Sequence, residues 1–138
     1  MLHGLNVSDL EWQRFLESGR RSERSVGRLS AYLNGFLLAT DREIRMGHEY
    51  ALKAVDKHGL EVGHLALVPT VISSGEAYFD RPKHVTFLYY SSAWKRWFQV
   101  TIKCCTERRR LFVTTFHGLG ADDVKRKRRR YQRVWPLE

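Results

Sequence analysis

Histidine and lysine side chains on two predicted elements are the residues of this sequence that could act together in a reaction. His48 and His58 fall on one face of a helix predicted from about residue 40 to 58, and His58 stands between Lys57 and Gly59. Metal-independent RNA cleavage needs a base for the 2′-hydroxyl, an acid for the leaving 5′-oxygen and a cation for the phosphorane. Histidine suits either proton transfer and lysine suits the phosphate, so we expect His58 to act as the base beside Lys57.

A predicted strand adds two further candidates. Thr115 and His117 share one face because side chains alternate along a strand, so one strand can present a hydroxyl donor and an imidazole acid. Each residue also has a structural interpretation. His58 at a helix C-terminus can simply complement the helix dipole, and His48 has a similar structural interpretation and a weaker functional case. Thr115 can be an ordinary β-forming residue, and His117 a histidine at the end of a strand.

Several common motifs are absent. The sequence has neither GxGxxG nor GxxxxGK[ST], so a nucleotide-binding loop of either kind is unsupported. His48-Glu49 begins like a zinc-protease motif, but Leu52 stands where the second histidine is needed. His48 and His58 would lie about 15 Å apart along a straight helix, too far to share one ion. We expect no metal and no cofactor.

The charge is strongly asymmetric. The 138 residues carry 24 Lys and Arg against 15 Asp and Glu, a net charge of +9. Residues 1–80 hold 9 basic and 11 acidic side chains, a net of −2, and residues 81–138 hold 15 and 4, a net of +11. A basic surface of this size points to a polyanionic partner, with nucleic acid the leading candidate.

The cations expected to contact phosphate lie on the predicted sheet and in the tail. Lys103 lies on the polar face of the second predicted strand, and Arg110 ends a run that precedes the third. The tail carries six consecutive cations, which repel one another and need a counter-charge. These are Lys125, Arg126, Lys127, Arg128, Arg129 and Arg130. A nuclear-localisation signal has the same composition, and the run does not distinguish RNA from other polyanions.

The composition excludes several classes of protein. No apolar run approaches the roughly 18–20 residues of a membrane span, which excludes a transmembrane protein, and residues 1–5 have no signal-peptide pattern. Cys104 and Cys105 are adjacent, so we expect reduced thiols and a cytoplasmic location. At 43% hydrophobic residues, the length suits one domain over 1–138.

Helical periodicity dominates the first half and strand periodicity the second. Helices are predicted over about 8–19, 25–39 and 40–58, the last opened by a Thr40–Glu43 capping box, with a short helix near Pro69. Strands are predicted over 84–90, 97–104 and 111–116, joined by short connections as an antiparallel meander. The tail reads either as a helix from Asp122 to Arg130 or as an edge strand over 131–135. The predicted class is α+β, with helices packed on one face of the sheet.

The order of these features resembles a known ribonuclease superfamily. The resemblance is carried by Lys57-His58-Gly59 at a helix end, by Leu65-Ala66-Leu67-Val68-Pro69-Thr70-Val71-Ile72, and by a meander that ends in Val113-Thr114-Thr115-Phe116-His117. The superfamily groups barnase, EndoU, tRNA-cleaving colicins and RelE-like toxins (the BECR fold), and the closer likeness is to its phage-associated and polymorphic-toxin branches. The similarity covers about residues 44–117.

The resemblance implies an α+β domain of helices and a meander of three or four strands, with a metal-free endoribonuclease site. It puts a helix-borne catalytic pair at Lys57-His58, a phosphate-contacting hydroxyl at Thr115, and polar substrate contacts near Tyr90 and Lys95. It divides the chain into an N-terminal helical extension over 1–40, a nuclease-like core over 41–117 and a basic segment over 118–138. His117 has no counterpart in the superfamily.

We therefore expect a small cytoplasmic endoribonuclease toxin that cleaves RNA, with tRNA the first candidate substrate, by attack of the 2′-oxygen. Lys57, Lys95 or Arg110 would hold the phosphate, and an acidic antitoxin or immunity protein would cover the basic surface. The alternative is a non-catalytic nucleic-acid-binding or phage accessory protein that uses the sheet and the tail. A sequence-specific DNA binder would need a recognition helix, which the sequence does not show.

Overall fold

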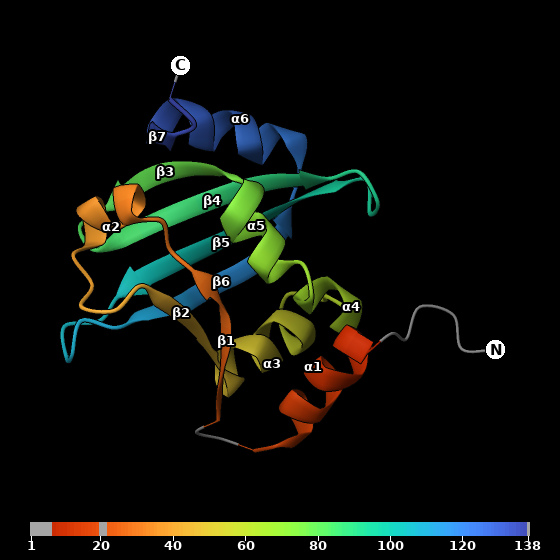
Figure 1. Ribbon diagram of the computed structural model, residues 1–138. Helices are drawn as coiled ribbons and strands as arrows, with labels where there is room; N and C mark the ends of the chain where they lie inside the picture. Colours follow the sequence, from red (N-terminus) through yellow and green to blue (C-terminus); the bar gives the residue numbers. More distant parts are fainter. Residues whose placement is uncertain (1–6, 20–21, 138) are drawn as a thin grey trace.

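The computed structural model describes residues 7–19 and 22–137. Thirteen elements are assigned in this part of the chain (Figure 1), and they follow one another as α1 (Val7–Glu17), β1 (Glu23–Arg28), α2 (Ala31–Leu37), β2 (Glu43–Gly47), α3 (His48–Asp56), α4 (Val62–Leu65), α5 (Val68–Ser74), β3 (Glu76–Arg81), β4 (His84–Ser91), β5 (Arg96–Cys104), β6 (Leu111–Leu119), α6 (Ala121–Arg130) and β7 (Gln132–Trp135). No helix of the described residues is long and apolar enough to cross a membrane.

One sheet carries the fold. Its seven strands lie in the order β1-β2-β6-β5-β4-β3-β7. The pairs from β3 to β6 are antiparallel, which confirms the predicted meander and extends it by one strand at its start. β2 joins β6 in parallel, so the sheet is mixed and larger than the three or four strands predicted. The α+β class is confirmed.

The two faces of the sheet are covered differently. On β5, Phe98, Val100 and Ile102 point into the main core, which also contains buried residues of α1 to α5. Trp97 points the other way, into a smaller cluster with Val124 of α6. The helices therefore do not all pack on one face as predicted, because α6 returns the chain across the opposite face to reach the edge strand β7 (Figure 1).

Two of the long helices predicted in the first half of the chain are only partly helical in the structure. The first four residues of the predicted helix 25–39 belong to β1, which has a bulge near Gly27, and only Ala31–Leu37 is helical. The predicted helix 40–58 begins instead with β2, and α3 starts at His48. Thr40 caps no helix, because its hydroxyl donates to the carbonyl oxygen of Arg108 at 2.8 Å.

The tail combines the two structures that the sequence left open. α6 places Asp122 and Asp123 in its first turn and four cations in its last, so both ends complement the helix dipole. The N-cap residue is Gly120, not Asp122. The chain then forms β7, which pairs antiparallel with β3 and completes the edge of the sheet.

Candidate active site

His58 and His117 meet across a cavity between the C-terminal end of α3 and β6. Their ring centroids lie 5.5 Å apart. The cavity has a volume of about 350 Å³ and is lined by Tyr50, Lys53, Lys57, His58, Thr114, Thr115, Phe116 and His117. The structure therefore brings together His58, Lys57, Thr115 and His117, which the sequence nominated from two separate elements.

The end of α3 fixes the position of His58. The last helical turn closes with the backbone N–H groups of Lys57 and His58 both donating to the carbonyl oxygen of Lys53, at 2.8 and 3.1 Å. Gly59 follows with φ of 68°, a left-handed conformation that glycine adopts at little cost. The chain therefore turns away directly after His58, which leaves that side chain exposed at the helix end.

A β-bulge in β6 shapes the opposite wall of the cavity. Thr101 of β5 pairs with Thr115 while Ile102 pairs with Val113, so Thr114 is the extra residue. Bulges of this kind re-aim side chains and are frequent beside active sites. Beyond the bulge the alternation is regular, and Thr115 and His117 share one face as predicted.

The environment keeps the His58 imidazole neutral more readily than usual. Partial burial lowers its pKa below the ordinary 6.5, and the positive charges of His117, Lys53 and Lys57 lower it further. On His117, Nδ1 lies 2.9 Å from the carbonyl oxygen of Gly118. A carbonyl oxygen only accepts, so Nδ1 carries a proton and Nε2 is the nitrogen left for exchange with a substrate.

His48 occupies a different environment. It is only 7% exposed, its Nε2 donates to the carbonyl oxygen of Leu16 at 2.6 Å, and its ring meets Phe15 edge to face. It lines a neighbouring cavity but not the one that holds His58 and His117. These contacts tie α1 to the start of α3, so we assign His48 a structural role and remove it from the catalytic set.

Four other predicted substrate contacts lie outside the cavity. Arg110 donates to Glu23 at 2.6 Å, and its guanidinium lies over the ring of Phe112. Arg110 is therefore held in an ion pair, whereas the sequence predicted that it would bind phosphate. Lys103 lies in β5 opposite Phe112. Tyr90, at the end of β4, packs its half-exposed ring against Trp97, and Lys95 lies in the β4–β5 turn.

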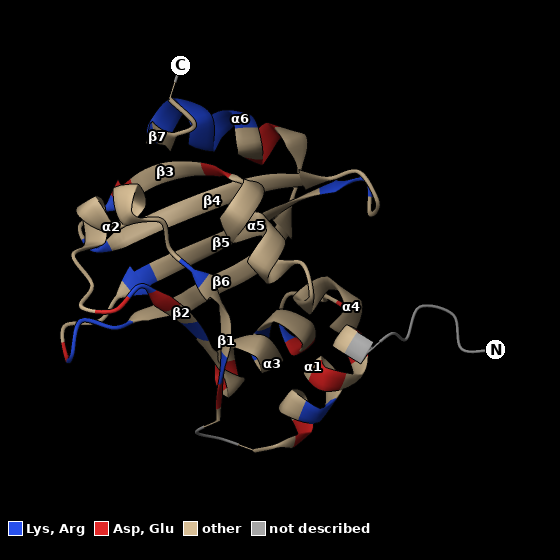
Figure 2. Cartoon of the chain, viewed as in Figure 1, with Lys and Arg blue, Asp and Glu red and all other residues tan. Residues whose placement is uncertain are grey.

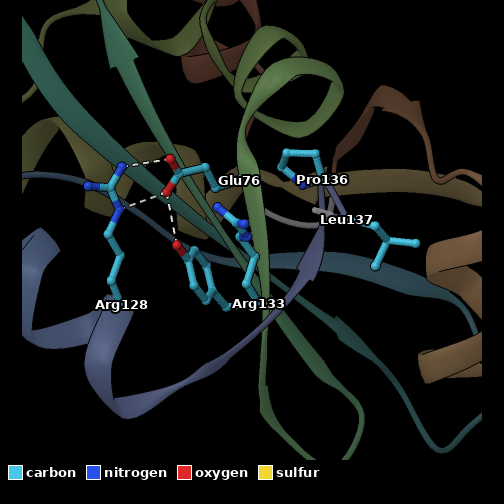
Figure 3. Close-up of a pocket in the computed structure, with 6 residues that line it drawn as sticks. Glu76, Arg128, Arg133, Pro136 and Leu137 are labelled. Atoms are coloured by element: carbon cyan, nitrogen blue, oxygen red, sulfur yellow. Dashed lines mark hydrogen bonds and ion pairs between the residues drawn. The ribbon is translucent and has the colours of Figure 1, made fainter.

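The cations of α6 are only partly available to a ligand. Figure 2 shows Lys and Arg covering α6 after its first turn. Arg128 makes two hydrogen bonds to Glu76, at 2.9 and 2.6 Å, and Glu76 also accepts from the Tyr78 hydroxyl at 2.9 Å (Figure 3). Arg126 pairs with Asp123. Arg128 therefore holds α6 on β3, and the predicted phosphate contact is not available to it while this pair is intact.

Several cations of α6 lie around one cavity. Arg126, Lys127, Arg129 and Arg130 line a cavity of about 470 Å³ together with Asp123 and Tyr131. Lys127 and Arg130 lie over the Tyr131 ring at 5.8 and 5.6 Å. The basic residues of the C-terminal part do not form a single face, because Lys95 and Arg110 lie near opposite ends of β5 and α6 lies across the sheet from the main core.

Two residues of the cavity escaped the sequence interpretation. Tyr50 lies two turns and Lys53 one turn before Lys57 along α3, and all three line the cavity. The spacing i, i+3, i+7 places them on one helix face, which is the signal that could have found them. The predicted helix over 40–58 contained all three positions, but the sequence-based candidates came from the neighbouring face that carries His48 and His58.

The described residues contain no group of three His, Cys, Asp or Glu side chains that could hold a metal ion. Cys104 and Cys105 are both free thiols, and burial raises the pKa of Cys104. No protein-family model, no curated protein and no solved structure matches the chain.

Proposed function

We propose that this protein is a metal-independent endoribonuclease whose reacting groups are His58 and His117. The observation that carries the proposal is the contact between two imidazoles from distant parts of the sequence, beside two lysines and a strand hydroxyl. Two proton-transfer groups and a cationic phosphate site are the requirements of 2′-oxygen attack on a phosphodiester.

The proposed roles follow from the environments of the two rings. His58, whose lowered pKa keeps it neutral, removes the proton from the 2′-hydroxyl. The 2′-oxygen bonds to phosphorus and the bond from phosphorus to the 5′-oxygen breaks. His117, as the imidazolium, gives the Nε2 proton to that leaving oxygen. The products are a 2′,3′-cyclic phosphate and a free 5′-hydroxyl, so atoms and protons balance.

The other cavity residues serve the phosphate. Lys53 and Lys57 supply positive charge to the non-bridging oxygens as negative charge develops on them. The Thr115 hydroxyl lies on the same strand face as His117 and donates a hydrogen bond to the same group. Exposed cations of α6 add contacts to the phosphates of the RNA backbone, which hold the RNA without recognising its sequence.

We further propose that the protein is a toxin and that tRNA is its substrate. Unopposed cleavage of tRNA harms any cell that contains the enzyme, so the proposal includes an inhibitor protein. Electrostatic complementarity favours an acidic inhibitor that covers the cations of α6 and of the cavity.

The direct test is cleavage of total tRNA in excess EDTA by the native protein and by His58→Ala and His117→Ala. His84→Ala is the matched control, because His84 lies on β4 outside the cavity and its Nδ1 lies 2.9 Å from the Pro82 carbonyl oxygen. We expect either active-site variant to lose about 10²-fold or more in rate, the control to retain full activity, and the product to end in a 2′,3′-cyclic phosphate.

Three outcomes would overturn this proposal. Cleavage that stops in EDTA would indicate a metal-dependent enzyme. Cleavage that persists in both histidine variants would place the chemistry elsewhere. Tight binding of intact RNA, with folded protein shown by circular dichroism, would indicate the non-catalytic binding protein instead.

A further inference from the structure

A chain of side-chain hydrogen bonds lies in the sheet beside His117. Gln99 Nε2 donates to the Thr101 hydroxyl oxygen at 3.1 Å, and the Thr86 hydroxyl donates to the Asp80 carboxylate at 3.1 Å. The two threonine hydroxyl oxygens lie 2.8 Å apart. Because the single hydroxyl proton of Thr86 goes to Asp80, Thr101 is the donor between them. The chain therefore has one direction, from the amide of Gln99 to the carboxylate of Asp80.

This direction fixes the orientation of the Gln99 amide. Its Nε2 is used by Thr101, so its Oε1 forms the other end of the chain. Gln99 is only 6% exposed, and Oε1 is buried without a hydrogen-bond partner among the residues that the structure describes. Buried polar atoms of folded proteins are nearly always paired, so this oxygen marks a position that suits a positively polarised group.

His117 is the side chain next to Gln99 on this face of the sheet. The two residues are direct partners in the β5–β6 register, where the Cβ atoms of a pair lie about 4.5–5.5 Å apart. Gln99 shares its face with Trp97, which points away from the main core. One pair further along, Thr101 lies opposite Thr115. The hydrogen-bond chain therefore runs under the β6 residues that line the His58–His117 cavity.

Positive charge faces His117 from the helix side. The charged and titratable groups on that side and on the β5 face are His58, Lys53, Lys57 and Tyr50 of α3 and the turn after it, and Lys103 four residues beyond Gln99. The proposed reaction needs His117 as the imidazolium, and neighbouring cations disfavour that form. Compensation has to come from the sheet side of the ring.

Two carboxylates of β3 act on the sheet side. Glu76 lies in the same row as His117, beyond Gln99, but Arg128 holds its carboxylate with two hydrogen bonds (Figure 3). Asp80 is connected to this row through the hydrogen-bond chain. In a chain of donors that ends on a carboxylate, each dipole has its negative end directed away from the carboxylate, and each bond polarises the next. The negative end of this chain is Gln99 Oε1.

We propose that Gln99 is a positioning residue that keeps His117 protonated for its role as the acid. Its Oε1, oriented by the chain to Asp80, places negative partial charge beside the imidazolium. Gln99 acts through the charge of His117 and not on the substrate, because Oε1 is buried. This inference rests on the proposed function, which assigns the acid to His117.

The pH profile of cleavage tests this role. Gln99→Met keeps the side-chain length and removes the carbonyl dipole, and Asp80→Asn removes the charge at the far end while it leaves an acceptor for Thr86. We expect the basic limb of kcat/KM to move down by about one pH unit in Gln99→Met, and by less in Asp80→Asn. Gln99→Glu, which puts a carboxylate beside His117, should move this limb upward. Gln132→Met, on the exposed edge strand β7, is the matched control and should leave the profile unchanged.

NMR of the His117 ring protons in the free proteins separates this inference from the proposed function. The titration midpoint of the ring should fall in Gln99→Met and in Asp80→Asn whether or not RNA is cleaved. If the native protein cleaves nothing but the midpoints fall, only the ribonuclease function fails. An unchanged midpoint in both variants, or a loss of rate that is equal at every pH, would show that Gln99 only supports the fold and would overturn the inference alone.

Discussion

The rings of His58 and His117 lie 5.5 Å apart because β2 pairs in parallel with β6. That register sets Ile44 opposite Leu111 and Arg45 opposite Phe112, and α3 begins directly after β2. α3 therefore runs beside the part of β6 that extends beyond the pairing, and His58, two residues after the end of α3, reaches His117. The proximity of the two histidines depends on a parallel contact between segments far apart in the sequence.

The pH dependence of cleavage should report the lowered pKa of His58. The base must be neutral, so the acidic limb of kcat/KM should have its midpoint below 6.5. Lys53→Met and Lys57→Met each remove a positive charge that lowers this pKa, and we expect either change to move the midpoint upward. Lys125→Met on α6 should not move it. An NMR titration of the His58 ring protons provides the independent check, and an unshifted midpoint in both lysine variants would contradict the electrostatic assignment.

The cations of α6 should separate into binding and structural groups. Arg129→Gln removes an exposed charge near Tyr131, so RNA affinity should fall and the slope of log K against log salt should decrease by about 0.7. Arg128→Gln should instead lower the free energy of unfolding by about 1–2 kcal/mol, because Glu76 loses both of its guanidinium hydrogen bonds. Fluorescence anisotropy at several salt concentrations and urea unfolding measure the two effects. Equal behaviour of the two variants in both assays would contradict the division.

The meander and half of the site were predictable from local pattern. β5 alternates Phe98, Val100 and Ile102 toward the main core with mostly polar residues on the opposite face, which is the period of a strand. The same period places Thr115 and His117 on one face. The Lys57-His58-Gly59 segment predicted the end of α3 because glycine stops helices in the left-handed conformation.

The rest of the fold and of the site depends on contacts between distant segments, which a local sequence pattern does not contain. β2 buries only Ile44 and Met46, and this short alternation is compatible with the first turn of a longer helix. Its strand state comes from pairing with β1 on one side and β6 on the other. Since the register of β2 positions α3, the meeting of His58 with His117 could not be derived from either segment alone.

Two glycines should respond in opposite ways to alanine. At Gly75, between α5 and β3, a Cβ would lie 2.5 Å from the carbonyl oxygen of Val71 and 3.0 Å from that of Leu88, and both are backbone atoms. We expect Gly75→Ala to lower the free energy of unfolding by about 2–3 kcal/mol. At Gly35, inside α2, a Cβ would meet no atom within 4 Å, so Gly35→Ala should raise that free energy by about 0.5–1 kcal/mol. Thermal and urea unfolding measure both, and a neutral Gly75→Ala would contradict the packing described.

His64 is only 3% exposed, and its ring packs edge to face on that of Trp94 with the ring centroids 4.1 Å apart. Burial lowers its pKa below 6.5, the charge of Arg96 lowers it further, and Glu61 opposes this. The unfolded chain therefore binds more protons at this residue than the folded chain does, so stability rises with pH across this range and is lost on acidification below about 6.5.

Replacing His64 should flatten that dependence and also weaken the fold. Nδ1 of His64 accepts the backbone N–H of Glu61 at 2.9 Å and caps α4, so His64→Ala should cost about 2–3 kcal/mol at neutral pH. The matched control is His84→Ala, which removes a partly exposed histidine at the start of β4. Urea unfolding between pH 5 and 8 compares the three proteins. A pH slope in His64→Ala equal to that of the native protein would show that another group, and not His64, governs the stability.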